Sequence, residues 1–361
     1  MVPEKAKRRQ FLIGAITVLL GVGCDAAPPQ SRSPRIRVLG MVQDGGLPQP
    51  GCWCRNCREA RRDLRKKHYI SSLALVIPLS QGGQETYLID ATPDIQAQLD
   101  CLHDLQSSSL SGVQRRPVDG IILTHAHIGH YLGLAFFGFE AINARGMPVF
   151  CTPRMAKFLR ENGPWSQLIK IENIALQEIN PGKTFRLPRD PANPYHVAIT
   201  PVQVSHRDEY SDTVGFLIRV EESAAPGKKG PALLYVSDTA PWGRWRSPLT
   251  ELIDREAVTV AILDGTFYSP EELPDRNIAE LGHPLMSDTM DLLEPMVRSG
   301  RLTVYFTHLN HSNPALQTMG PEYRSICKRG FHIAREGMEI PLQSYPPIHA
   351  TDPSRECASP N

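Results

Sequence analysis

The chain has 361 residues, of which 41% are hydrophobic and 21% are charged, and its formal net charge is +1. A chain of this length and composition can bury a large hydrophobic core and does not need disulfides or metal ions to hold its fold. Its near-neutral charge argues against a surface that attracts nucleic acid. We therefore expect a small-molecule substrate and no nucleic-acid partner.

Residues 1–27 have the pattern of an export signal. Lysines and arginines between positions 5 and 9 precede an apolar run from Phe11 to Gly23, and Cys24 and small residues follow. This run of 13 residues is too short to cross the hydrocarbon core of a bilayer as a helix. We expect the segment to direct export rather than to span a membrane.

The segment resembles two types of export signal. The pair Arg8 and Arg9 resembles a twin-arginine signal, and Cys24 resembles the acylated cysteine of a bacterial lipoprotein. Both predict an exported protein, either periplasmic or anchored to the membrane through a lipid on Cys24. Ordinary cleavage near Ala26 or Ala27 is the alternative, because a glycine stands where lipoprotein signals usually have leucine, three positions before Cys24.

The remaining chain predicts one layered domain of strands and helices. Proline and serine make residues 28–34 a linker, the domain is expected at 35–345, and a proline-rich, polar tail at 346–361 is expected to be flexible. Two strand patterns around Gly82-Gly83 predict a hairpin, and Pro93 stands where a helix can start. The predicted strands are 35–39, 71–79, 85–89, 120–123, 147–151, 197–204, 213–220, 233–236, 258–263 and 302–306, and the clearest further helices are 155–161 and 285–297. Strands interleaved with helices predict a mixed α/β fold.

Three histidines follow the predicted strand 120–123. His125 and His127 are two residues apart in an extended segment and so point to the same side, and His130 would open the next helix. Neutral imidazoles are common ligands of zinc, and buried histidines that serve only as core residues do not explain this spacing well. The segment therefore predicts a metal site.

This His-x-His-x-x-His pattern after an apolar strand resembles the metallo-β-lactamase superfamily. The resemblance implies a four-layer αββα sandwich, with the metal site on strand-end loops along one edge between the sheets. It also implies further ligands at the ends of later strands, where His206, Asp238 and His308 stand. By this resemblance one metal is held by His125, His127 and His206, and a second by His130, His308 and a bridging Asp238. The metals would be Zn²⁺, Mn²⁺ or Fe²⁺.

One position departs from the usual motif, which has aspartate where this chain has Gly129. Glycine supplies no carboxylate, so the second site would keep at most His130, His308 and Asp238. We expect a weakly held second metal, and we expect Gly129→Asp to strengthen it. The alternative is that glycine only permits a special loop conformation, and that another residue or water completes the site.

A second cluster predicts a structural zinc. Cys52, Cys54 and Cys57 supply three thiols, and His311 is the candidate fourth ligand. Disulfides are the alternative, because an exported chain meets an oxidising compartment.

These cysteines and the segment 90–99 resemble a narrower branch, which contains pyrroloquinoline quinone biosynthesis protein B and the phosphodiesterase associated with carbon–phosphorus lyase. That resemblance implies that His283 acts as a general acid beside Asp238, although a plain helix-entry histidine is an equal alternative. Asp90 and Asp264 would orient ligands, and Asp94 would be an ordinary helix-start acid.

The expected function is metal-dependent hydrolysis, in which a metal-bound hydroxide attacks a phosphodiester or a carboxylic ester or amide. One alternative is a cofactor-biosynthesis enzyme with an oxygenase-type step. The other is a relative that binds a ligand without turning it over.

Overall fold

Two seven-stranded mixed sheets make up the centre of the described structure, a computed structural model. It describes residues 33–342 except 81, 106–111, 113, 189–191, 222–229 and 274–281, and so the predicted signal and tail lie outside it. In the first sheet the strand order is β14-β1-β2-β3-β4-β5-β6. These strands are β1 (Arg35–Gly40), β2 (Ser72–Pro78), β3 (Gln84–Ile89), β4 (Gly120–Ile122), β5 (Met147–Cys151), β6 (Ile174–Glu178) and β14 (Glu339–Pro341).

The second sheet has the strand order β13-β12-β11-β10-β9-β8-β7. Its strands are β7 (Phe185–Leu187), β8 (His196–Gln203), β9 (Val214–Glu221), β10 (Ala232–Val236), β11 (Val258–Asp264), β12 (Thr303–Thr307) and β13 (His332–Ile333). The described helices are α1 (Arg55–Arg62), α2 (Ile95–Asp100), α3 (Ile128–Tyr131), α4 (Pro153–Glu161), α5 (Trp165–Lys170), α6 (Leu249–Arg255), α7 (Met286–Arg298) and α8 (Pro321–Lys328). None of these helices is long and apolar enough to span a membrane.

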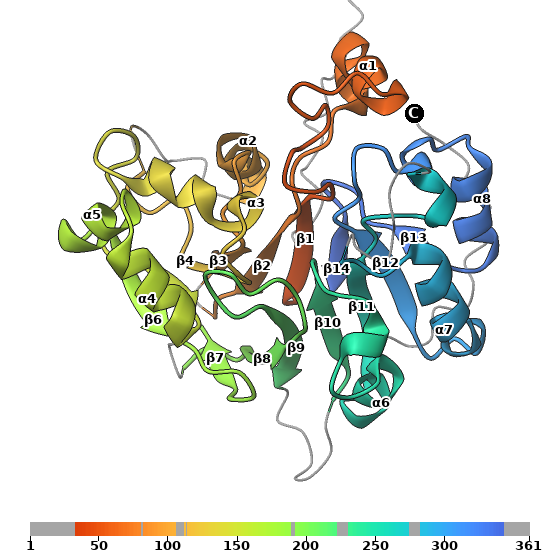
Figure 1. Ribbon diagram of the computed structural model, residues 1–361. Helices are drawn as coiled ribbons and strands as arrows, with labels where there is room; N and C mark the ends of the chain where they lie inside the picture. The colour runs from red at the N-terminus through yellow and green to blue at the C-terminus, as the bar shows by residue number, and fades with distance from the viewer. Residues whose placement is uncertain are drawn as a thin grey trace, which may run out of the picture. The chain divides into compact units, whose positions relative to one another are not determined.

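The sheets are buried on both faces, which makes four layers. In β2, Leu73 and Leu75 point into the core between the sheets, whereas Ala74 and Val76 belong to the outer core of the first sheet. This alternation follows from the two-residue repeat of a strand. Helices α2 to α5 cover the outer face of the first sheet and α6 to α8 that of the second (Figure 1). The predicted αββα sandwich is confirmed.

Parallel strands bring the site residues to one edge. Strands β3 and β4 pair in parallel in one sheet, and β10, β11 and β12 do so in the other. Because parallel strands end at the same edge, the loops that follow them lie together. Asp90, Asp238, His308 and the histidine segment that starts at residue 125 follow these strand ends, and Asp264 is the last residue of β11.

Every predicted strand is confirmed to within one residue at each end, and the differences concern helix starts and edge strands, among them β6, which was not predicted. Helix α2 begins at Ile95 rather than at Pro93, and α3 begins at Ile128, ahead of His130. Helix α3 is a single turn that continues as a 3₁₀ helix to Phe137. Edge strands of two or three residues, such as β13 and β14, were not predicted, because a run of that length carries too little periodicity to identify.

Candidate metal centre

One group of side chains joins the loops after β4, β8 and β10. The Nε2 atom of His125, the Nδ1 atom of His127 and the Nε2 atom of His206 lie 3.4, 3.6 and 3.2 Å from Asp238 Oδ2. All four atoms lie within 4.8 Å of one another. The structure thus assembles the first predicted ligand set with the carboxylate at its centre.

A second group joins α3, the loop after β12 and the loop after β1. His130 Nε2 and His308 Nε2 lie 3.3 and 3.6 Å from an oxygen of Asp44, and His308 Nε2 lies 3.9 Å from Asp238 Oδ2. Asp238 therefore stands between the two groups. Asp44 was missed from the sequence, and it adds a carboxylate to a group for which only His130, His308 and Asp238 were expected.

Hydroxyl and carboxylate groups hold the opposite nitrogen of three of these histidines. Thr124 Oγ1 lies 2.9 Å from His125 Nδ1, Asp90 Oδ2 2.7 Å from His130 Nδ1, and Thr266 Oγ1 3.0 Å from His308 Nδ1. Each ring is thereby turned so that Nε2 faces the cluster. Such partners behind metal-binding histidines fix the ring orientation and raise ligand affinity. Asp90 is thus an orienting residue, as expected.

The backbone also adopts unusual conformations here. Asp90 and His308 have φ angles of 69° and 62°, in the left-handed region that residues other than glycine rarely adopt. Such conformations persist where surrounding contacts over-determine them, and they cluster at functional sites.

The cluster has the character of a metal site, because buried polar atoms face one another without hydrogen bonds. Among the described residues, Nε2 of His125, His130 and His308 and Oδ1 of Asp44 and Asp238 are buried and have no hydrogen-bond partner. Leaving such groups unpaired costs stability, and a divalent cation would satisfy all of them. The residues present therefore fit one or two metal ions.

The carboxylates of the cluster are strongly acidic. Burial favours the neutral acid, yet His130 and His308 hold the pKa of Asp44 well below its usual range. The pKa of Asp238 is likewise well below its usual range, because burial is outweighed by His283, His308 and the other histidines around it. Both groups are thus anionic at neutral pH and suited to a cation.

His283 lies against the second group. Its Nδ1 atom is 2.9 Å from Asp264 Oδ2 and 3.3 Å from Asp238 Oδ1. Burial lowers its pKa, but Asp264 and Asp238 raise it more, to about 9. Asp264 also accepts hydrogen bonds from the backbone of Thr239 and Thr266, so it orients its neighbours as expected.

The cysteine cluster forms at a separate place. The Sγ atoms of Cys52 and Cys54 lie 3.3 and 3.5 Å from His311 Nδ1, and Cys57 completes the group. The three cysteines are free thiols, which excludes the disulfide alternative in this structure. Burial and the neighbouring thiols raise the pKa of Cys57 to about 12, and a bound cation would relieve this repulsion between thiolates. Asp94 belongs to neither cluster, and its side chain accepts a hydrogen bond from the Ile70 amide.

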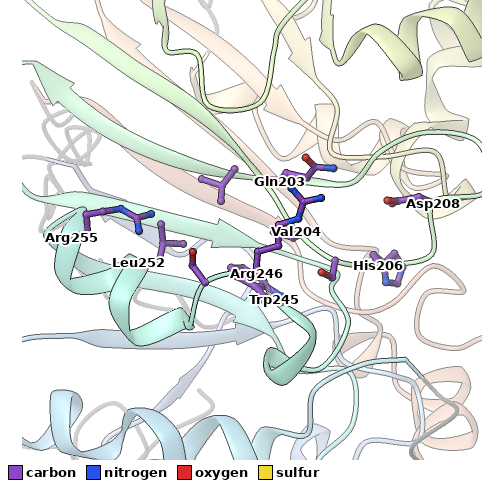
Figure 2. Close-up of a pocket in the computed structure, with 11 residues that line it drawn as sticks. Gln203, Val204, His206, Asp208, Trp245, Arg246, Leu252 and Arg255 are labelled. Atoms are coloured by element: carbon purple, nitrogen blue, oxygen red, sulfur yellow. The ribbon is translucent and has the colours of Figure 1, made fainter.

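A pocket of about 410 Å³ opens beside the first group. His206 and Asp208 lie at one end and Arg255 at the other, with Arg246 between them (Figure 2). Glu209, also missed from the sequence, is exposed and lies 3.2 Å from His127 Nε2. Two guanidinium groups thus line the pocket into which His206 faces.

The fold and this site define a metallo-β-lactamase-type protein. Residues 85–309, more than half of the chain, match the model of the β-lactamase superfamily domain, and the chain belongs to this family.

Among named relatives, coenzyme PQQ synthesis protein B of Azotobacter vinelandii is 29% identical over 323 residues, which cover 85% of this chain and 99% of that protein. The crystal structure of Zn²⁺-bound PqqB from Methylobacterium extorquens has a TM-score of 0.66 at 21% identity, over 85% of this chain and 100% of that one. A diphosphatase of the PhnP family has a TM-score of 0.55 at 18% identity, over 85% and 96%. The predicted resemblance to this branch is confirmed, and these structural likenesses show a shared fold.

Proposed function

We propose that this protein is a metal-dependent hydrolase. The observation that carries the proposal is the pair of buried histidine and carboxylate groups that meet at Asp238. One ion would be held by His125, His127, His206 and Asp238, and a second by His130, His308 and Asp238. When bound, Zn²⁺ or another divalent ion at such a site activates water and polarises the electrophilic centre of the substrate.

The residues around the site have complementary roles in this proposal. Thr124, Asp90 and Thr266 keep the imidazoles turned toward the cluster. His283, held by Asp264, would carry a proton to the leaving group. Burial of the cluster keeps bulk water away from these groups and strengthens their electrostatic interactions.

The pocket supports an anionic substrate. Arg246 and Arg255 line the pocket, with Arg246 nearer to His206, and guanidinium groups match the geometry of phosphate oxygens. Among the substrates expected from the sequence, this favours a phosphodiester over a carboxylic ester or amide.

Hydrolysis of model substrates by protein loaded with Zn²⁺ or Mn²⁺ tests the proposal. We expect turnover of bis(p-nitrophenyl) phosphate that exceeds turnover of p-nitrophenyl acetate. His206→Ala should lower kcat/KM at least about 100-fold, because it removes a proposed ligand. The control is His103→Ala, which changes an exposed histidine away from the cluster. Equal rates for the His206→Ala variant and the parent would contradict the proposal.

A second candidate is a step in cofactor biosynthesis. It is favoured by the similarity to proteins named coenzyme PQQ synthesis protein B, which extends over 85% of this chain and 99% of the relative. On this alternative the site would hold iron and carry out an oxygenase-type step. Bound iron in the purified protein together with O₂ uptake, without phosphodiester turnover, would favour it. Absence of turnover in both assays would favour a relative that only binds a ligand.

A further inference from the structure

The side chain of Asp44 lies beside Gly129, the position at which the usual histidine motif has an aspartate. A Cβ atom built on Gly129 would overlap Asp44 Oδ1 and would come within 2.7 Å of Asp44 Cγ and 2.8 Å of Asp44 Cα. Carbon atoms of real side chains do not approach this closely. The volume that a side chain at position 129 would need is therefore filled by the carboxylate of Asp44 and by its backbone.

The carboxylate faces the second group of ligands. Its Oδ1 atom is buried, has no hydrogen-bond partner, and lies 3.3 Å from His130 Nε2 and 3.6 Å from His308 Nε2. Both nitrogens are themselves buried without hydrogen bonds. Three unpaired ligand atoms thus converge from three separate segments of the chain.

Backbone hydrogen bonds fix the loop that carries Asp44. The Gln43 amide donates to the Leu309 carbonyl at 2.9 Å, and the Leu309 amide donates to the Met41 carbonyl at 3.0 Å. The Gly46 amide closes a turn onto Gln43 at 2.8 Å, with Gly46 at a φ angle of 68°. This pairing ties the loop to the segment that bears His308, so the two ligands are positioned together.

We propose that Asp44 is a ligand of the second metal, and that Gly129 is needed because any larger residue would displace it. The carboxylate missing from the histidine motif is thereby supplied by the loop after β1. This inference rests on the metal centre proposed above and adds a ligand to it. Two active-site metals are then expected instead of one. Gly129→Asp should weaken the second metal rather than strengthen it, because the new side chain would push the Asp44 loop away.

The number of zinc ions per chain after dialysis, measured by elemental mass spectrometry, tests this inference without an activity assay. We expect three zinc ions per chain in the parent, one at the cysteine cluster and two at the centre. Asp44→Ala should leave two ions and weaken the lost one at least about 100-fold in a zinc titration. Gly129→Ala, which removes no ligand, should give the same loss.

Two further variants separate ligand loss from damage to the fold. Asp44→Asn keeps the side-chain shape and should still weaken the second zinc, with an unchanged melting temperature of the zinc-free protein. Gln43→Ala changes the neighbouring residue of the same loop and should retain three ions. If Asp44→Ala retained three ions with parental affinity, the proposed role of Asp44 would be overturned, and the proposed metal centre would not. A parent that binds zinc only at the cysteine cluster would overturn both this inference and the proposed metal centre.

Discussion

At the scale of single residues, function depends on pairs in which one side chain orients another. His283 is such a residue, since Asp264 holds its Nδ1 atom at 2.9 Å and the pair is buried beside Asp238. A histidine oriented in this way can deliver a proton, whereas a helix-entry histidine would affect only packing.

His283→Gln should therefore slow hydrolysis most for substrates with poor leaving groups. We expect kcat to fall about 100-fold or more with a phenyl or alkyl phosphodiester, and far less with a p-nitrophenyl phosphodiester, whose leaving group needs little protonation. Metal content measured on the same samples is the control. Equal losses with both leaving groups would argue against proton donation, and a loss of metal would make His283 a ligand.

Glu272 gives a pH-dependent contribution to stability. Its side chain accepts hydrogen bonds from Ser312 and from the Tyr268 amide, but burial outweighs them and raises its pKa from 4.5 to about 7. The folded state therefore holds this proton up to higher pH than the unfolded state does. This residue's contribution to the free energy of unfolding is largest below pH 4.5, falls as the pH rises from 4.5 to 7, and is constant above.

Urea unfolding at several pH values between 4.5 and 8 checks this contribution. The parent should lose roughly 1–3 kcal/mol relative to Glu272→Gln across the window, because the variant cannot ionise. Glu271→Gln, at the exposed neighbouring position, should follow the parent. Parallel curves for the parent and Glu272→Gln would show that the pKa of Glu272 is not raised.

At the scale of elements, two loops each contribute residues to both candidate metal clusters. The loop after β1 leads from Asp44 to Cys52, and the loop after β12 leads from His308 to His311. The Asn56 side chain donates to the His311 carbonyl at 2.9 Å, which ties the start of α1 to the second loop. The cysteine cluster therefore joins two segments that are more than 250 residues apart in the sequence.

Loss of one thiol should weaken zinc binding at this cluster and the connection between the two segments. We expect Cys54→Ser to release one zinc ion per chain and to lower the melting temperature by several degrees, because binding energy at a structural site is also folding energy. Cys101→Ser, at an exposed cysteine outside the cluster, should change neither quantity. An unchanged zinc count and melting temperature in Cys54→Ser would rule out the structural zinc.

At the scale of the whole molecule, the export signal predicted at residues 1–27 lies outside the described residues and remains a prediction. Mass spectrometry of mature protein from the native host should find a chain that starts at an acylated Cys24, or near Ala27. Replacement of Arg8 and Arg9 by lysine should keep the protein in the cytoplasm. An intact Met1 on protein from the cell envelope would contradict cleavage.

Much of the fold and of the first ligand group was predictable from the sequence alone. Strand periodicity and strand-end histidines are local features, and His125 and His127 follow a strand that can be identified from its own residues. The resemblance to a known superfamily then supplied the later candidate ligands His206, Asp238 and His308.

The place of Asp44 in the candidate site was decided only by the tertiary structure. Its role depends on the approach of one loop to Gly129, 85 residues further along the chain, and on hydrogen bonds between that loop and Leu309. A sequence pattern records what each segment prefers by itself, whereas this approach depends on how the chain folds after β1 and β4, two strands of the same sheet. The glycine at position 129 was visible in the sequence as a missing carboxylate. That another aspartate fills the same space could be seen only once the chain was folded.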